Sequence, residues 1–342
     1  MTACTCGLVD SHTHWVPGHF PAYMGTRKGV AWPSMAPADS ACQRHVMING
    51  NVYRTVPDAS WDGARRADDM ARTGVSHQVV SPMPELLSYW LNVDDALSLT
   101  RFLNDELAAL VQAWPRHFTA LGAVPLQDVG LAVRELERLM RELGLAGVEL
   151  GSNIDGKPVS HPDFEPFFSA AESLGAAVFV HALRPCGMDR LVGPPLLEQV
   201  LAFPGEVGLA AASFMTSGVL ARHPRLRLAF SHGGGALPMV LPRLQHAWEN
   251  MAPVSQCMAQ APREMARRLF VDNLVYDRAA IRYLMEVYGP TQVMAGSDYP
   301  FAIMERDAAL RIGSLELDDE STRLMSRDNA LRWIGRTLPF SD

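Results

Sequence analysis

Two histidines near the start of the chain have the spacing of a metal-binding pair. His12 and His14 stand two residues apart, shortly after the apolar residues Leu8 and Val9. If this segment is extended, its alternation turns both imidazoles to the same side, where one cation can accept both. Structural and surface pairs of this kind are also common, so the pair alone is weak evidence for a metal site.

Two further candidate ligands lie far along the chain. His181 ends the apolar run Ala177–Val180, and Asp298 lies between Gly296 and Pro300. Each has an ordinary alternative, a hydrogen-bonded core histidine in the first case and a turn-capping aspartate in the second. Taken together, three imidazoles and one carboxylate suit Zn²⁺ and leave room for a bound water. Such a water loses a proton near neutral pH and can act as a nucleophile or an acid/base.

A fifth polar residue, His232, precedes three glycines, Gly233 to Gly235. The glycines allow close backbone approach, but the lysine and the spacing of a phosphate-binding loop are missing, which argues against phosphate binding. We therefore predict that His232 works in acid/base catalysis and is not a metal ligand. Asp298 is a second candidate for proton transfer.

The elements that position these residues alternate between strand-like and helix-like segments. This alternation predicts βα units and a parallel sheet. The eight predicted strands are Gly7–Asp10, Val75–Ser81, Phe118–Val124, Gly147–Leu150, Ala177–Val180, Leu226–Phe230, Leu269–Val275 and Gln292–Ala295. The predicted helices are Trp61–Thr73, Asp94–Trp114, Leu131–Leu143, Asp163–Leu174, Pro238–Asn250 and Arg278–Tyr288.

The candidate residues follow the carboxyl ends of strands one, five, six and eight. Barrel enzymes place their chemistry at this end, and closure alone makes the first and last strands neighbours. We therefore predict an α/β fold, a distorted (β/α)8 barrel of the TIM type that forms a single domain over residues 1–342. An insertion over residues 15–60 is expected to cover the mouth as a lid. A helical tail is expected from about Leu315.

Composition limits the classes of partner. The chain has 342 residues, of which 48% are hydrophobic and 20% charged, as in ordinary globular proteins. A formal net charge of −7 argues against nucleic acid or an anionic membrane as partner. The five cysteines are an odd number in a chain too large to need disulfide staples. We therefore expect reduced thiols, no membrane span and a cytoplasmic location.

Five motifs together are typical of one family: Asp10-Ser11-His12-Thr13-His14, Ser88-Tyr89-Trp90, Phe179-Val180-His181, His232-Gly233-Gly234-Gly235-Ala236-Leu237-Pro238 and Gly296-Ser297-Asp298-Tyr299-Pro300-Phe301. With them the sequence resembles the amidohydrolase-2 superfamily over nearly its whole length, in particular the group of non-oxidative decarboxylases that act on aminocarboxymuconate semialdehyde. The resemblance implies one divalent metal ion, usually Zn²⁺ with Mn²⁺ as the alternative, bound by His12, His14, His181 and Asp298. It also implies proton transfer by His232 and no redox cofactor.

The resemblance further implies how a substrate carboxylate is bound. Arg54 and Arg243 match arginines that hold carboxylates, a role that suits the two parallel hydrogen bonds of a guanidinium. Phe301 is a further expected substrate contact. In the relatives the second arginine comes from the partner subunit, which implies a homodimer with Arg243 acting across its interface.

The pocket wall departs from the family pattern. Residues 182–218 contain no tryptophan, although the family carries one at the active site, and they include the extra prolines Pro194 and Pro195. Ala182 follows His181 where many relatives have proline. The substrate is therefore left open.

Three functions remain at this point. The first is a decarboxylase that releases CO2 from a small unsaturated or hydroxylated aromatic or heteroaromatic acid in a catabolic pathway, such as a carboxymuconate semialdehyde or a dihydroxy-aromatic acid. The second is a hydrolase of a lactone or amide that uses the same metal site. The third, a metal-binding barrel without enzymatic activity, is disfavoured by five polar groups at one mouth.

Overall fold

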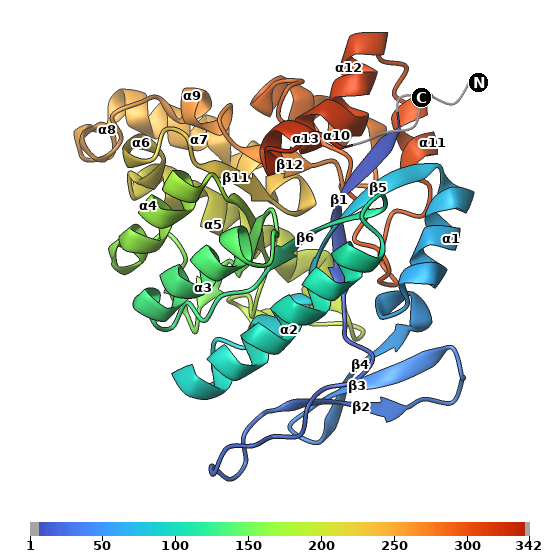
Figure 1. The fold of residues 1–342 in the computed structure, drawn as a ribbon. Helices are drawn as coiled ribbons and strands as arrows, with labels where there is room; N and C mark the ends of the chain where they lie inside the picture. The colour runs from blue at the N-terminus through green and yellow to red at the C-terminus, as the bar shows by residue number, and fades with distance from the viewer. Residues whose placement is uncertain (1–6, 339–342) are drawn as a thin grey trace.

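A parallel sheet of eight strands forms the centre of the computed structural model, which describes residues 7–338 (Figure 1). All of its pairings are parallel, and the strand order follows the chain. The predicted strands are confirmed in number and order. The sheet consists of β1 (Leu8–Trp15), β5 (Val75–Pro82), β6 (Phe118–Gly122), β7 (Gly147–Gly151), β10 (Ala177–His181), β11 (Arg227–Phe230), β12 (Phe270–Asp272) and β13 (Val293–Met294).

The seam between the last and first strands is joined by backbone hydrogen bonds. The amide of Ser11 donates to the carbonyl of Ala295 at 2.8 Å, and the amide of Asp298 donates to the carbonyl of His12 at 2.8 Å. A parallel bridge also links Thr13 with Tyr299. The sheet therefore closes as a TIM-type barrel, and this seam brings two of the candidate ligands together.

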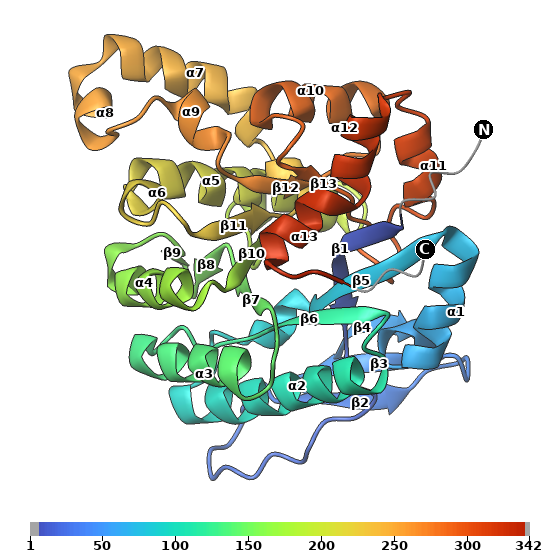
Figure 2. The same ribbon diagram turned by 45° about the horizontal axis from the view of Figure 1, so that its top comes forward.

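Helices surround the barrel, as Figure 2 shows. The six predicted helices are confirmed, with small shifts at their ends. The helices are α1 (Gly63–Thr73), α2 (Val93–Ala113), α3 (Val129–Arg141), α4 (Glu165–Leu174), α5 (Phe203–Thr216), α6 (Val219–Arg222), α7 (Leu237–Asn250), α8 (Ala252–Cys257), α9 (Pro262–Ala266), α10 (Arg278–Tyr288), α11 (Ala308–Gly313), α12 (Asp319–Arg323) and α13 (Asn329–Ile334). Shorter turns are η1 (Asp58–Ser60), η2 (Pro84–Leu87), η3 (Pro162–Phe164), η4 (Met188–Arg190), η5 (Glu198–Ala202), η6 (His232–Gly234) and η7 (Leu324–Asp328).

The insertion after β1 forms an antiparallel sheet of its own, which lies beyond the carboxyl end of β1 in Figure 1. Its strands are β2 (Pro33–Pro37), β3 (Gln43–Ile48) and β4 (Asn51–Pro57), and a small hairpin elsewhere pairs β8 (Asn153–Ile154) with β9 (Lys157–Pro158). Val46 and Val56 are fully buried and pack in one cluster with Leu86 and Phe301. These contacts fix the small sheet against the mouth of the barrel.

The carboxyl-terminal helices close the opposite end of the barrel. Trp333 of α13 is fully buried in a cluster with Val9 and Phe179, and its ring lies 5.7 Å from that of Phe179. Because Val9 and the other strand residues of this cluster point inward, α13 covers the interior apolar layer of the barrel. The predicted helical tail therefore plugs the end remote from the candidate ligands.

Within residues 7–338, no helix is both long and apolar enough to cross a bilayer. Cys42, Cys186 and Cys257 are exposed free thiols. The remaining two cysteines of the sequence, Cys4 and Cys6, lie outside the described residues.

Candidate active site

Four side chains from three strand ends meet at the mouth of the barrel. His12 and His14 come from β1, His181 ends β10, and Asp298 follows β13. One ligand atom of each lies within 4.8 Å of the corresponding atoms of the other three, and all four residues are buried. The backbone of Asp298 has a φ of 64°, which is uncommon for a residue other than glycine. The structure thus brings together the four residues that the sequence singles out.

The outer nitrogen of each ring is held by an acceptor. Nδ1 of His12 lies 2.7 Å from Oδ2 of Asp272, and Nδ1 of His14 lies 3.1 Å from the carbonyl oxygen of Pro82. Nδ1 of His181 lies 2.8 Å from the carbonyl oxygen of Ala182. Each of these acceptor oxygens can form a hydrogen bond only with a nitrogen that carries a hydrogen. In a neutral ring, each Nδ1 therefore carries the ring hydrogen and each Nε2 keeps a free lone pair.

These lone pairs face one another across a short distance. The Nε2 atoms of His12 and His14 lie 3.0 Å apart, and Nε2 of His14 lies 3.0 Å from Oδ1 of Asp298. Nε2 of His181 is buried without a hydrogen-bond partner. Lone pairs so arranged repel one another unless a cation lies between them. Three nitrogens and one carboxylate oxygen are ligands that zinc and related divalent ions accept, so the residues present fit such an ion.

Asp272, which the sequence analysis missed, supports this centre from behind. Besides Nδ1 of His12, its carboxylate accepts hydrogen bonds from the backbone amides of His232 at 2.9 Å and Gly233 at 2.8 Å. Although burial opposes its charge, these bonds and the neighbouring histidines hold the pKa of Asp272 below its usual value. Asp272 therefore fixes the ring of one candidate ligand and the backbone of the candidate acid/base together.

For each of the candidate ligands His12 and Asp298, burial and neighbouring charges shift the pKa in opposite directions. Burial disfavours a proton on His12, but the hydrogen bond and charge of Asp272 raise the pKa of His12 to about 9. Burial likewise disfavours the charge of Asp298, yet the close contact with His14 and the other nearby histidines hold its pKa well below the usual range. A metal ion must compete with a proton for His12, so metal affinity rises with pH.

Two buried residues hold the ligand segments in place. Asp10 accepts hydrogen bonds from both the amide and the hydroxyl of Ser297, which ties β1 to the loop that carries Asp298. Arg66 is fully buried, donates to the carbonyl of His14 at 2.6 Å, and lies 4.8 Å from the ring of Tyr299. Both contacts cross the seam of the barrel and restrain the segments on either side of it.

His232 lies beside the four candidate ligands without joining them. It follows β11 in η6, and its ring lies 4.9 Å from that of His181 and 5.5 Å from that of His12. Burial lowers the pKa of His232 to about 4, with the neighbouring charge of His12 acting in the same direction. His232 is therefore neutral at physiological pH and can accept or relay a proton.

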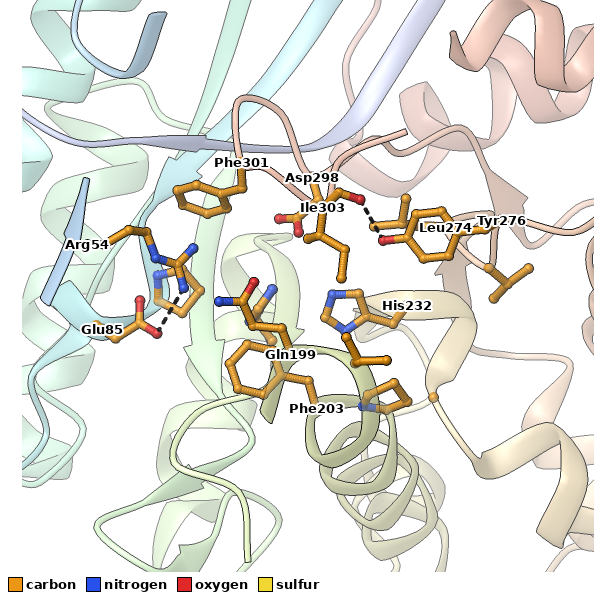
Figure 3. A pocket seen from close by; sticks show the side chains of 16 residues that line it. Arg54, Glu85, Gln199, Phe203, His232, Leu274, Tyr276, Asp298, Phe301 and Ile303 are labelled. Atoms are coloured by element: carbon orange, nitrogen blue, oxygen red, sulfur yellow. Dashed lines mark hydrogen bonds and ion pairs between the residues drawn. The ribbon is translucent and has the colours of Figure 1, made fainter. Parts of the chain in front are cut away.

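A cavity of about 310 Å³ opens in front of these residues (Figure 3). His181, His232 and Asp298 line it together with Arg54 and Phe301. The guanidinium of Arg54 lies 4.5 Å above the ring of Phe301, and the same ring stacks on His14 with 5.0 Å between centroids. The rest of the lining is mostly apolar, which suits a small ring with few polar substituents.

Arg243 does not line this cavity. It lies on an exposed part of α7, on the same helix as the exposed residues Met239 and Val240. Within one chain it is therefore not brought to the other site residues. Its predicted action across a subunit interface stays a prediction.

The wall that departs from the family pattern also contributes to the cavity. Gln199, Val200 and Phe203 line it, and Gln199 and Phe203 extend toward its centre in Figure 3. Phe203 stacks against His232 with 6.4 Å between ring centroids. Phenylalanine and glutamine side chains thus occupy a wall for which a tryptophan was expected.

The comparison with known families agrees with this geometry. A family model described as amidohydrolase matches residues 9–336. The chain belongs to the amidohydrolase family. This amidohydrolase is 34% identical over 330 residues to the 2-amino-3-carboxymuconate-6-semialdehyde decarboxylase of Dictyostelium discoideum, an alignment that covers 96% of this chain and 91% of that protein. The predicted resemblance is confirmed.

Solved structures share the fold of this amidohydrolase. The 5-carboxyvanillate decarboxylase of Sphingomonas paucimobilis superposes with a TM-score of 0.79 at 24% identity, over 97% of this chain and 100% of that one. The 5-carboxyvanillate decarboxylase of Novosphingobium aromaticivorans, complexed with manganese and 4-hydroxy-3-methoxy-5-nitrobenzoic acid, has a TM-score of 0.73 at 25% identity, with 82% of each chain covered.

A second buried carboxylate lies close to the centre of this amidohydrolase and was also missed from the sequence. Glu149 is fully buried in β7, and its Oε2 lies 3.9 Å from Nδ1 of His14. Burial raises the pKa of Glu149 to about 7. A charged residue inside an apolar strand is a signal that could have identified it, as could the polar end of β12 for Asp272.

Proposed function

We propose that this amidohydrolase is a metal-dependent decarboxylase that releases CO2 without oxidation from a small unsaturated or hydroxylated aromatic carboxylic acid. The observation that carries the proposal is the position of His232, whose backbone amide is held by Asp272, beside four converging ligand atoms in a largely apolar cavity. The relatives support it, since the Dictyostelium protein and both solved structures are named as decarboxylases of unsaturated or aromatic acids.

The ligand set accounts for one part of the chemistry. A divalent cation bound by His12, His14, His181 and Asp298 would hold oxygen atoms of the substrate and draw electron density from it. We propose zinc for this chain, with manganese as the alternative because the Novosphingobium structure contains it.

The side chains around the cavity account for substrate binding and proton transfer. Arg54 can hold a carboxylate of the substrate, and Phe301 supports its guanidinium from one side. His232 relays a proton to the carbon that bears the departing carboxylate, and the conjugated system supplies the electron pair of the new C–H bond. The electron pair of the breaking C–C bond then restores the conjugation as CO2 leaves. Asp298 is a second candidate for this transfer.

The competing function is hydrolysis of a lactone or amide at the same ligand set. The two reactions differ in product, because a decarboxylase releases CO2 and a hydrolase releases an acid and its alcohol or amine. The mostly apolar cavity and Arg54, which is the one arginine or lysine that the described part of this chain contributes to its lining, suit an aromatic or unsaturated acid better than a peptide-like amide.

A product assay tests the proposal. Protein loaded with zinc or manganese is incubated with carboxyl-labelled 2,6-dihydroxybenzoate, 6-methylsalicylate and 5-carboxyvanillate, and labelled CO2 is counted. We expect release from at least one acid, loss after chelation, and recovery on return of the metal. His181→Asn should be inactive, whereas His161→Asn, at an exposed histidine remote from the cavity, should match the wild type. Acid release from a lactone panel without CO2 would favour the hydrolase.

We further propose a homodimer in which Arg243 enters the site of the partner subunit. On α7, Met239 is 74% exposed and Val240 44% exposed, and Leu209 of the adjacent α5 is 61% exposed. Apolar side chains grouped on neighbouring helices are typical of protein interfaces. The insertion over residues 15–60 serves as a cover for the site, and the enzyme acts in the cytoplasm.

A further inference from the structure

A second cavity of about 280 Å³ adjoins the first. The two are neighbours, since Glu85 and Phe203 line both. The second is lined in addition by Tyr53 of the insertion and by the segment that follows β10, which carries Arg184. Nothing in the reaction described above uses this space.

Arg184 is held in an unusual way on the wall of the second cavity. Its guanidinium carbon lies 3.4 Å from the centroid of the Trp90 ring, a close cation–π contact. Within residues 7–338, its guanidinium makes no hydrogen bond or ion pair. Its backbone φ is 42°, which a non-glycine residue rarely adopts. The stack therefore orients a guanidinium whose donors are free for a ligand.

The charged side chains of the second cavity differ in how far their neighbours compensate them. The carboxylate of Glu85 accepts a hydrogen bond from the hydroxyl of Tyr53 and lies 3.9 Å from the guanidinium of Arg54, so its charge is largely compensated. Glu198 also lines the cavity and belongs to the wall that departs from the family pattern. Among the described residues that line this cavity, the charged groups without an ion-pair partner are thus Arg184 and Glu198, and the carboxylate of Asp155 acts on Arg184 from outside the lining.

We propose that Arg184 binds a second carboxylate of the substrate, at the end remote from the metal centre, and so selects dicarboxylates over monocarboxylates. A guanidinium stacked on an indole presents its remaining donors in one plane, which matches the two oxygens of a carboxylate. Glu198 opposes this binding unless a hydroxyl or amino group beside the carboxylate donates a hydrogen bond to it. The inference rests on the proposed function for the orientation of the substrate.

Binding measurements on the metal-loaded protein test this selection without turnover. Benzoate serves as the monocarboxylate probe, and terephthalate and trans,trans-muconate serve as dicarboxylates. Titration calorimetry gives the affinity ratio of each dicarboxylate to benzoate. We expect Arg184→Gln to lower this ratio about ten- to a hundredfold, as for a lost hydrogen bond to a charged group. Arg184→Lys should recover only part of it, because an ammonium cannot form the planar pair.

A second substitution should change the affinity for dicarboxylates in the opposite direction, which distinguishes a loss of carboxylate recognition from a loss of folding. Glu198→Gln should raise the affinity for both dicarboxylates and leave benzoate unchanged, since it removes a repelling charge. Arg44→Gln is the matched control, because Arg44 also stacks on a tryptophan, Trp61 at 4.7 Å, but lines neither cavity. If Arg184→Gln leaves the ratio for both dicarboxylates unchanged, or weakens benzoate equally, the proposal is wrong. A failure of decarboxylation would appear in the CO2 assay and not in these ratios.

Discussion

The carboxylate of Asp272 accepts a hydrogen bond from Nδ1 of His12 at 2.7 Å, and the same oxygen accepts the backbone amide of His232 at 2.9 Å. One side chain therefore orients a candidate metal ligand and the loop of the candidate acid/base. A carboxylate in this position fixes the ring tautomer and makes the ligand nitrogen a stronger donor to a metal. The two functions of the site are mechanically coupled through Asp272.

Replacement of Asp272 should therefore weaken metal binding. Asp272→Asn keeps the size of the side chain but removes its charge and one of its acceptor oxygens. We expect the metal dissociation constant to rise about ten- to a hundredfold, as for other residues behind metal ligands. Competition with a chelating dye measures it. Asp277→Asn, at the cap of α10, is the control, because asparagine caps a helix as well as aspartate does. Equal affinities for wild type and Asp272→Asn would contradict the role of Asp272.

Replacement of His232 should separate chemistry from metal binding. We expect His232→Asn to keep its metal and to lose about 10²- to 10⁴-fold in kcat, the range for loss of a general acid or base. Metal analysis of the purified variant and the CO2 assay give the two values. Because burial lowers the pKa of His232 to about 4, its protonation should not reduce wild-type activity above pH 5. A metal-free His232→Asn variant would instead identify His232 as a ligand.

Subunit mixing should reveal whether Arg243 acts in its own chain or in its partner. Arg243→Gln and His232→Asn should each be nearly inactive alone. If Arg243 crosses the interface, a dimer with one chain of each kind has one complete site. An equal mixture after subunit exchange should then recover about one quarter of wild-type activity, because about half of the dimers are mixed and each has one working site.

The subunit-mixing experiment needs two controls. Light scattering must first show a dimer in solution, and the mixture must be compared with unmixed chains treated in the same way. If Arg243→Gln alone is inactive and mixing recovers no activity, Arg243 acts in its own chain. An Arg243→Gln variant that is active alone would show that Arg243 has no catalytic role. A monomer would contradict the interface itself.

Protein stability should fall in mild acid because of His77. Both of its ring nitrogens are hydrogen-bonded, Nδ1 with the carbonyl of Arg116 and Nε2 with the hydroxyl of Thr119. Burial lowers the pKa of His77 to about 4, whereas an unfolded histidine has a pKa near 6.5. Between these values the unfolded chain binds a proton that the folded chain does not, so the free energy of unfolding decreases as pH falls.

The contribution of His77 to the free energy of unfolding is fully present above about pH 6.5. It falls by roughly 3 kcal/mol as the pH is lowered to 4. Urea unfolding of the apo protein at several pH values measures it. His77→Gln should lower stability at neutral pH and reduce the slope below pH 6.5. A parallel loss in wild type and variant over that range would show that His77 keeps an ordinary pKa.

Much of the barrel could be predicted because its strands carry their own signals. β10 is an apolar run with two valines that ends in His181. Strand ends of a parallel sheet share one edge, so the positions of the candidate ligands also followed from the sequence. Asp298 was placed beside His12 by the closure of the sheet alone.

The parts that were missed depend on contacts across the chain. α5 was not predicted because Phe203–Thr216 is apolar on most of its surface and shows no polar face. The role of Asp272 arises only where β12 lies against His12, which no local pattern records. The insertion was predicted only as a lid and no strands were predicted within it, whereas Val46 and Val56 supply the core of an antiparallel sheet.

The seam that joins the first and last strands also orders events during synthesis. His12 and His14 are synthesised before Asp298 and before the segment that pairs with β1, because translation runs from the amino to the carboxyl end. Until then the first strand has an open edge and an incomplete set of ligands. A nascent chain cannot acquire its metal in the final geometry before the barrel has closed, so metal uptake becomes a late step of maturation.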